Sequence, residues 1–397
     1  MKHLLYFLAL LRASVSDEIA RQELTTSTNL FSEDLYKTIA KTSAKTFLAS
    51  PLSTEIALAL AQTGCKGETG EEIRSSLFLP TSQSDIESGF STLLTNYLTG
   101  NGFYTLHTLN KIYVRRNFQV KENFKRVVKQ VFRSESQRID FTKRAKAAQS
   151  MNKWAEKNSR NRIRNIAVPN SLTARTRMVF LNGLYFRANW SKPFQLSLTR
   201  KDVFHVNSTT SVPVDMMRQN GAQLYNVFEN PALDAQFLEL PLRGDEASMV
   251  LVLPNSPNGL AILESQIGKV LEPFESNLDY VNLAVPKFRI DTRINLKFVL
   301  KNLGVNKAFD LSQADCSGIG GKKGDLAISE IFQKSFIDVG EGGVEASAGT
   351  DDDETLVINT TPNFRNFKDF VADHPFLFYV KIKKIIAFVG RVLDPTV

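Results

Sequence analysis

The stretch DVGEGGVEASAGTDDDE, at residues 338–354, has almost no side chains that could pack into a core. It lies between two apolar segments, EIFQKSFIDV and HPFLFYVKIKKIIAFVGRV. The polar span that begins at Glu341 extends to about residue 373. Loops longer than about 12–15 residues without secondary structure of their own are usually functional or disordered. We therefore expect an exposed functional loop at about 341–373.

The rest of the chain can bury a large core, because 43% of its 397 residues are hydrophobic. It contains no linker rich in proline, glycine and serine, and no internal repeat. Length alone would allow two or three domains, but without a linker one domain over residues 17–397 is the simpler interpretation.

The N-terminus has the pattern of a secretory signal peptide at residues 1–16. Lys2 supplies the positive charge, residues 4–11 form the apolar run, and Ser14-Val15-Ser16 precedes the expected cleavage point. We therefore expect a secreted, extracellular protein. No other run reaches the ~18 apolar residues that a membrane span needs, which predicts a soluble mature chain without a membrane partner.

Hydrophobic periodicity changes along the chain. PLSTEIALALAQTG (51–64) and KENFKRVVKQVF (121–132) have helical spacing. RMVFLNGLYFRANW (177–190), VNLAVPKFRI (281–290) and the closing PFLFYVKIKKIIAFVGRV (375–392) are typical of strands. Helices that come first and a large sheet that comes later indicate the α+β class.

The sequence leaves two covalent features undecided, a disulfide and glycosylation. Cys65 and Cys316 could form one disulfide or remain two buried thiols. In a secreted protein the sequons at Asn207 and Asn359 are candidate glycosylation sites. A third sequon begins at Asn189, which we expect to be buried and unmodified because aromatic and apolar residues flank it.

Positive charge gathers in KRVVKQVFR (125–133) and in KRAKAAQSMNKWAEKNSRNRIR (143–164), within a chain of net charge +8. The helical spacing of both segments favours solvated helix faces. The alternative is a weak binding surface for a polyanion, such as a heparin-like sulfated glycan. No aromatic interleaving indicates nucleic acid.

Catalytic signals are weak. Only His107, His205 and His374 remain after the predicted signal cleavage, and none has a clear partner in the sequence. Asp-Cys-Ser-Gly at 315–318 lacks the glycine that precedes a serine-protease nucleophile. We find no metal-binding or phosphate-binding motif, so we expect neither an enzyme nor a resident metal or cofactor.

Several segments together resemble the serpin family. They include FLASPLSTEIALALAQTGCKGETGEEI (47–73), MNKWAEKNSRNRIRN (151–165) and VFLNGLYFRANWSKPF (179–194), and further matches follow in family order. The resemblance covers nearly the whole mature chain. It implies a monomer of the serpin fold, with about nine helices, three β-sheets and an exposed reactive-centre loop near the C-terminus.

The resemblance also gives the loop a function. EGGVEASAG is similar to the family's loop hinge, which here comprises Glu341, Gly343, Val344, Glu345, Ala346, Ser347, Ala348 and Gly349. In the family the target protease attacks the loop and forms an acyl-enzyme. The loop then inserts into the main sheet and traps the protease, which implies a metastable suicide substrate.

The resemblance places the sheet-opening region at Ser50, Ser53, Asn182 and Gln333. Two of its positions depart from the family pattern. Gln333 stands where inhibitory members often carry a histidine, and Thr46 where they often carry an asparagine. Asn182 and Gln333 remain able to hydrogen-bond to each other.

The family's spacing from the hinge places the reactive bond at Val357–Ile358, whereas counting back from DHPF places it nearer Pro362. Val357 suits an elastase-like serine protease, and Leu356 suits a papain-like or cathepsin-like cysteine protease. Arg365 would suit a trypsin-like enzyme.

Two functions follow from the resemblance. The first is a secreted inhibitor whose partner is its target protease. The alternative is a non-inhibitory carrier, chaperone or storage protein whose loop is cleaved without trapping. The acidic run at 351–354 favours this alternative, because part of it would be buried on insertion.

Overall fold

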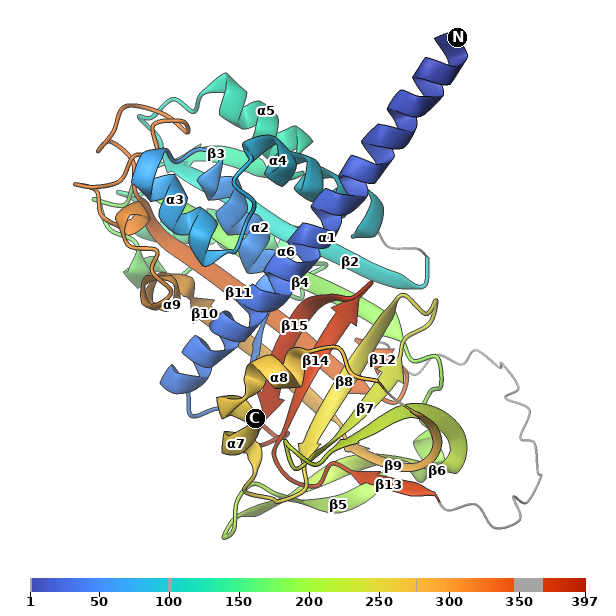
Figure 1. Ribbon diagram of the computed structural model, residues 1–397. Coiled ribbons are helices and arrows are strands. Elements are labelled where there is room, and N and C mark those ends of the chain that lie inside the picture. The colour runs from blue at the N-terminus through green and yellow to red at the C-terminus, as the bar shows by residue number, and fades with distance from the viewer. Residues whose placement is uncertain (1, 99–101, 276, 346–366) are drawn as a thin grey trace.

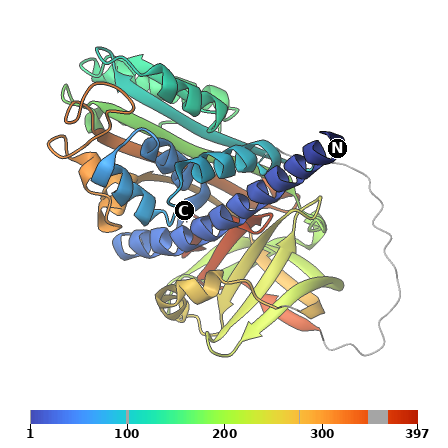
Figure 2. The same cartoon turned by 45° about the horizontal axis from the view of Figure 1, so that its top comes forward.

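A computed structural model describes residues 2–98, 102–275, 277–345 and 367–397. Within these residues it contains nine α-helices and two hydrogen-bonded β-sheets, which confirms the predicted α+β class. Figure 1 shows most of the helices gathered around one end of the molecule, with α7 and α8 beside the strands that run through its centre and its other end, and Figure 2 shows the same arrangement from a second direction. The helices are α1 (Lys2–Thr42), α2 (Pro51–Gln62), α3 (Gly67–Ser76), α4 (Gln83–Thr92), α5 (Glu122–Gln130), α6 (Arg144–Asn158), α7 (Leu260–Ser265), α8 (Ile267–Leu271) and α9 (Leu296–Asn302).

The smaller sheet has six strands in the order β10-β11-β12-β4-β2-β3. Its central strands β4 and β11 run parallel and pair directly from Met178 opposite Ile328 to Leu184 opposite Ser335. At one end of this pairing the short β12 lies between them, antiparallel to both. The strands are β2 (Tyr104–Arg115), β3 (Glu135–Ile139), β4 (Met178–Asn189), β10 (Phe288–Asn295), β11 (Ile328–Gly340) and β12 (Gly343–Val344).

The larger sheet has nine strands in the order β1-β15-β14-β8-β7-β6-β9-β13, with β5 paired to β6. We expected three sheets, but the described residues form two. The 20-residue strand β6 pairs with β5, β7 and β9 and so joins all nine strands in one sheet. Its pairing with β9 has a register shift between Asn220 and Leu224. The strands are β1 (Phe47–Ala49), β5 (Arg200–His205), β6 (Ser211–Asn230), β7 (Ala235–Pro241), β8 (Ala247–Pro254), β9 (Asn277–Pro286), β13 (Lys368–Val371), β14 (Phe376–Ile382) and β15 (Ile385–Val392).

The central strands β4 and β11 of the six-stranded sheet are buried on both faces, whereas the edge strands β3 and β10 are partly exposed. Side chains alternate along a strand, so in β4 Phe180 joins the main core while Val179 and Leu181 join a second cluster. That second cluster includes Met151 of α6. Helix α6 therefore covers one face of β4 and β11, and the main core covers the other.

Helix α2 packs inside the molecule, as its composition predicts. Ser50 caps it by accepting a hydrogen bond from the Ser53 amide at 3.2 Å, and Pro51 occupies the first turn, where its missing N–H costs nothing. Every residue of α2 before Gln62 is buried. α2 is therefore a core helix, although it carries the buried polar residues Ser53, Thr54 and Glu55. Its capped N-terminus lies beneath β4 and β11.

The structure answers the cysteine question that the sequence left open. Cys65 and Cys316 form a disulfide with an S–S distance of 2.00 Å, across a sequence separation of 251 residues. Cys65 follows α2, and Cys316 lies in the segment before β11. A disulfide of this kind typically stabilises a fold by about 2–4 kcal/mol, so it secures this corner of the helical region.

The predicted modification sites differ in exposure. Asn207 is exposed in the turn between β5 and β6, and its side-chain oxygen accepts hydrogen bonds from Thr209 and Thr210. Asn189, expected to be buried, is half-buried at the end of β4, because only one side of this strand end is covered. Asn359 lies outside the described residues.

Helix α1 contains the predicted signal peptide and continues beyond it without a break. In Figure 1 its N-terminal end projects away from the rest of the molecule, while its later turns pack against it. No helix in the described part of the chain is both long enough and apolar enough to cross a membrane. Cleavage after residue 16 stays a prediction.

A carboxyl group is buried between α1 and α2. Glu55 is 0% exposed, and one of its carboxyl oxygens contacts the Thr28 hydroxyl. The Thr28 Oγ1 also lies 2.8 Å from the Leu24 carbonyl oxygen, to which it can donate its hydrogen. A protonated Glu55 can donate to the Thr28 oxygen and leave that hydrogen for Leu24. Burial raises the pKa of Glu55 to about 8, against an ordinary value of 4.5, so the group is mostly neutral at pH 7.

This carboxyl group should make stability depend on pH. Between pH 4.5 and about 8 the folded protein keeps a proton that the unfolded chain releases, so the free energy of unfolding falls as pH rises. The loss is on the order of several kcal/mol by pH 8. Glu55→Gln should remove this dependence. Denaturant midpoints of both proteins at pH 5, 7 and 9 test it, and parallel profiles would contradict a neutral Glu55.

Candidate functional site

The segment predicted to be the loop hinge, called the hinge below, begins inside the six-stranded sheet. After β11 the chain reverses, and β12 enters between two strands, with Val344 opposite Val339 of β11 and Ala188 of β4. The Glu345 amide then donates to the Asp338 carbonyl at 2.6 Å. The first hinge residues are thus already held as a strand at the end of the β4–β11 pair, a position that Figure 1 shows for β12.

Trp190 fixes the reversal that leads into the hinge. Its amide donates to the Gly342 carbonyl at 3.0 Å, and its indole Nε1 donates to the Gly340 carbonyl at 2.9 Å. Gly343 then passes so close to β4 that a Cβ would lie 2.2 Å from the Ala188 carbonyl oxygen, and its φ is +147°. Glycine is therefore required here both by space and by backbone conformation.

Glu341 anchors the start of the hinge as a charged group. Its carboxylate lies 2.9 Å from Lys287 Nζ and accepts a hydrogen bond from Thr199 Oγ1 at 2.9 Å. Burial alone would raise its pKa, but Lys287 and Thr199 outweigh that effect and hold the pKa below its ordinary value. The ion pair attaches the base of the loop to the segment that joins β9 to β10.

The predicted sheet-opening residues lie together beneath the centre of this sheet. Ser50, Ser53, Asn182 and Gln333 are all 0% exposed. Gln333 Nε2 donates to Asn182 Oδ1 at 2.8 Å, and the same oxygen accepts from Ser53 Oγ at 2.9 Å. Gln333 Oε1 accepts from the Ser50 amide at 3.1 Å. One buried polar network therefore links β4, β11 and the N-terminus of α2.

Thr46 takes no part in this network. Its hydroxyl accepts hydrogen bonds from the amides of Leu393 and Asp394, at 2.9 and 3.2 Å. The side chain therefore secures the C-terminal segment beside β1. The remaining predicted loop residues, from the hinge run to the reactive-bond candidates, lie outside the described residues: Ala346, Ser347, Ala348, Gly349, Leu356, Val357, Ile358, Pro362 and Arg365.

Three partners of the site were not found in the sequence. Lys287, Thr199 and Arg162 each reach a hinge glutamate from a distant part of the chain. Lys287 and Glu341 are 54 residues apart, so no local pattern links them. The sequence did contain one indication of such partners: two glutamates lie in a segment expected to enter a sheet, and buried carboxylates need cationic partners.

His374 and His205 each contact nearby residues of the fold. His374 contacts its neighbour Asp373 at 2.7 Å and the Pro254 carbonyl at 2.8 Å. His205 lies on the exposed β5–β6 hairpin, 3.1 Å from Ser211. Among the described residues no group of three or more potential ligands is placed to hold a metal ion.

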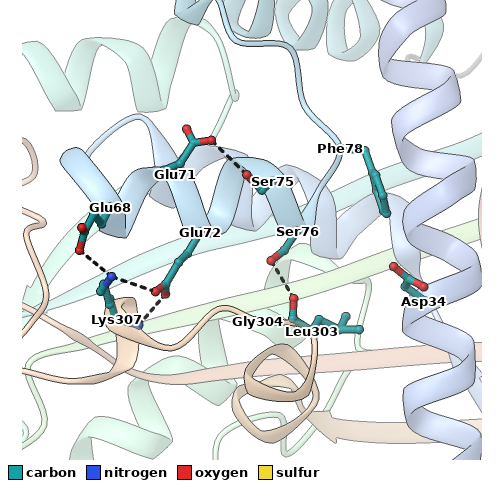
Figure 3. Close-up of a pocket in the computed structure, with 10 residues that line it drawn as sticks. All are labelled: Asp34, Glu68, Glu71, Glu72, Ser75, Ser76, Phe78, Leu303, Gly304 and Lys307. Carbon is teal, nitrogen blue, oxygen red and sulfur yellow. Dashed lines mark hydrogen bonds and ion pairs between the residues drawn. The ribbon is translucent and has the colours of Figure 1, made fainter.

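A hollow of about 600 Å³ lies between α1, α3 and the segment after α9 (Figure 3). Two of its four carboxylates face Lys307, whose Nζ is 2.6 Å from Glu68 and 3.6 Å from Glu72. Glu72 also accepts hydrogen bonds from the amides of Asn306 and Lys307. These contacts connect α3 to Asn306 and to the start of η4 (Lys307–Phe309), so we infer that they stabilise the fold and take no part in the hinge.

A family model described as Serpin (serine protease inhibitor) matches residues 26–395. The chain belongs to the serpin family. Serine protease inhibitor 42Dd of Drosophila melanogaster is 32% identical over 366 residues, which cover 92% of this chain and 95% of that protein. Antichymotrypsin-2 of Bombyx mori is 34% identical over 350 residues, which cover 87% and 91%.

Solved serpin structures agree with the fold. The crystal structure of Serpin48 from the insect Tenebrio molitor is 43% identical and matches with a TM-score of 0.87, covering 94% of this chain and 98% of that one. A structure described as cleaved Serpin 42Da matches with a TM-score of 0.81 at 28% identity. Serpins are generally protease inhibitors and not catalysts.

Val344 provides a direct test of the hinge. It is 0% exposed between β4 and β11, where an arginine would bury an unpaired charge at a cost of several kcal/mol. Val344→Arg should therefore expel β12, and amide hydrogen exchange in the peptide covering 340–345 should accelerate strongly. Val344→Thr, of matched shape and β-branching, is the control and should keep most of the protection. Equal protection in Val344→Arg would contradict the placement of β12.

Proposed function

We propose that this serpin is an inhibitor that acts as a suicide substrate, with the segment from Glu341 to about residue 373 as its reactive-centre loop. The observation that supports this most is β12, because residues 343–344 are already a strand between β4 and β11. Continued insertion would extend an existing pairing. It would not have to nucleate a new one.

The energetics favour insertion once the sheet opens. β4 and β11 pair directly over most of their shared length, so a new strand would replace one ladder with two. Each additional backbone hydrogen bond contributes about 0.5–1.5 kcal/mol net. The native fold would then be metastable: it persists because loop insertion is slow, and not because it is the state of lowest free energy. The Gln333–Asn182 network lies where the strands must part and would contribute to that barrier.

The loop sequence determines which target protease we propose. We place the reactive bond at Val357–Ile358, where Val357 suits an elastase-like serine protease and Leu356 a papain-like or cathepsin-like cysteine protease. Cleavage near Pro362, or at Arg365 by a trypsin-like enzyme, is the alternative. A glycan on Asn359 would lie beside the preferred bond.

Secretion accompanies this function in our proposal, supported by the signal-peptide pattern at residues 1–16 and by the exposed sequon at Asn207. A weak polyanion partner is supported by the exposed cations Lys125, Arg126 and Lys129 of α5. Lys125 is partly neutralised by Glu122 at 2.7 Å. We propose that the protein acts as a monomer.

The alternative is a non-inhibitory serpin, favoured by the acidic run at 351–354. Loop cleavage separates the two functions. If the loop inserts after cleavage, the added central strand should raise the thermal midpoint by tens of degrees, as the family resemblance implies for an inserted strand with its additional backbone hydrogen bonds. An unchanged midpoint after confirmed cleavage would support the non-inhibitory function.

Covalent trapping is the decisive measurement. The purified protein is incubated with an elastase-like, a trypsin-like and a cathepsin-like protease, and the products are boiled in detergent. We expect a surviving serpin–protease band with at least one of them, and mass spectrometry of the released C-terminal peptide identifies the bond. Val344→Arg should be cleaved at that bond without forming the band. Cleavage without any band in the unmodified protein would refute inhibition of these classes.

A further inference from the structure

A hollow of about 870 Å³ lies between four segments that are far apart in the sequence. They are the residues before β1, the turn between β5 and β6, the first half of β10, and the C-terminal segment after β15. The described residues that line it belong neither to the hinge nor to the sheet-opening region. Ligand pockets typically have volumes of about 300–1,000 Å³, so this hollow is large enough to hold a ligand.

Apolar side chains form one part of the lining. Ile290 and Pro395 are buried. Val206 and Leu393 are half-buried and pack against the main core. Such side chains favour contact with the apolar faces of a ligand, because the contact removes both surfaces from water.

The charged side chains of the lining balance each other. Lys45 and Arg289 stand against Asp291 and Asp394, which gives no net side-chain charge. Asp291 also pairs with Lys334 at 2.9 Å, and Asp394 accepts a hydrogen bond at 2.8 Å from the amide two residues further on. The lining therefore fits a neutral ligand that has both apolar faces and groups able to form hydrogen bonds.

Asn207, the first residue of a glycosylation sequon, also lines the hollow. It is exposed, and its Oδ1 accepts hydrogen bonds from the amides of Thr209 and Thr210, both at 2.9 Å. The Thr209 hydroxyl donates to the same oxygen at 2.9 Å. These contacts fix the side chain through its oxygen and leave Nδ2, the atom to which an N-linked glycan is attached, outside the hydrogen bonds of the turn.

We propose that Asn207 carries an N-linked glycan whose first two sugars, both N-acetylglucosamine, occupy this hollow. The glycan then joins the turn between β5 and β6 to β10 and to the C-terminal segment. This inference rests on the secretion that accompanies the proposed function, because the sugar is attached in the secretory pathway.

The attachment uses a lipid-linked oligosaccharide diphosphate as the sugar donor. The bond between C1 of the first sugar and the diphosphate oxygen breaks, and the diphosphate leaves with the electron pair of that bond. Asn207 Nδ2 forms a bond to C1 and loses one of its two protons to a base of the transferring enzyme. The product is a neutral glycosyl amide, so the turn gains no charge.

The position of the attachment point makes weak sugar contacts sufficient. A tethered group has an effective concentration in the millimolar range near its attachment point, so the sugars do not need the affinity of a free ligand. N-acetylglucosamine is neutral, and the C–H groups of its ring form apolar faces. Its hydroxyl and acetamide groups can form hydrogen bonds with Lys45 and Thr396 of the lining. The lining and the sequon thus favour the same occupant.

Cleavage of the glycan tests whether its first sugars are covered. The Asn359→Gln protein, which lacks the other exposed candidate sequon, is secreted from cells that make high-mannose glycans, and peptide mapping determines whether Asn207 is occupied. An endoglycosidase that cuts between the first two sugars is applied to the native protein and to the isolated glycopeptide. If the docked form predominates by about ten to one, the native protein should be cleaved about tenfold more slowly.

Ala44 separates docking from simple obstruction by the protein surface. It is exposed and lines the hollow, so Ala44→Trp should fill part of the hollow and displace the sugars. The endoglycosidase should cleave this variant several-fold faster than the unmodified protein. Ala44→Ser is the matched control and should be cleaved as slowly as the unmodified protein.

Amide hydrogen exchange gives a second measurement that needs no substitution in the hollow. Removal of the whole glycan by an amidase, which converts Asn207 to aspartate, should accelerate exchange several-fold in the peptide covering 389–397. The endoglycosidase product keeps the first sugar and gains no charge, so it should show a smaller acceleration. The peptide covering α7 contributes no residue to the lining and should be unchanged.

The outcomes separate this inference from the proposed function. An unoccupied Asn207 in the secreted protein would overturn it, as would equal cleavage rates in the native protein and the glycopeptide, or in Ala44→Trp and Ala44→Ser. Should Ala44→Trp fold poorly, unchanged exchange at 389–397 after glycan removal would decide against it. A protein that traps a protease while its Asn207 glycan is freely cleaved refutes this inference alone. A covered glycan on a protein that traps none refutes the inhibitory function alone.

Discussion

The parallel pairing of β4 with β11 is the contact on which the rest of the structure depends. It lies between two cores, with α6 and its cluster on one face and the main core on the other. Two side chains of that pair, Asn182 and Gln333, meet in a buried polar network that also includes the capped end of α2. The sheet is thus closed by groups that are well satisfied only while its strands remain adjacent, since a buried polar group without a partner is costly.

The two glutamates of the predicted hinge have pKa values shifted in opposite directions by their surroundings, lowered for Glu341 and raised for Glu345. Glu341 has Lys287 and Thr199 within hydrogen-bond distance, which keeps its charge and fixes the base of the loop. Glu345, four residues later, enters a buried position with one half-exposed arginine at 3.5 Å. The first residue is an anchor. The second is held under conditions that favour its neutral form.

Much of this architecture is readable from the sequence, and the reasons for the exceptions are physical. Periodicity predicted α2, α5 and β4, whereas the strand-like segments 281–290 and 375–392 are each divided between two strands, β9 and β10 and β14 and β15. Family resemblance predicted the loop and selected Ser50, Ser53, Asn182 and Gln333, which the structure brings together. The Cys65–Cys316 pairing, the role of Thr46 and the partners of Glu341 and Glu345 depend on contacts between distant segments. No local pattern encodes such contacts. The joining of sheets through β6 likewise depends on the path of one long strand.

The orientation of β12 has a consequence for the geometry of any inserted loop. β12 is antiparallel to both of its neighbours, so a strand that continued it would exchange one parallel ladder for two antiparallel ones, which are slightly more stable per residue. Its register is set in the resting molecule, with Val344 turned into the main core. Because side chains alternate, the same register would turn Asp352 and Glu354 toward that core, while Asp351 and Asp353 would face the opposite side. The pairing of two residues would thus determine which carboxylates of the acidic run lose their water on insertion.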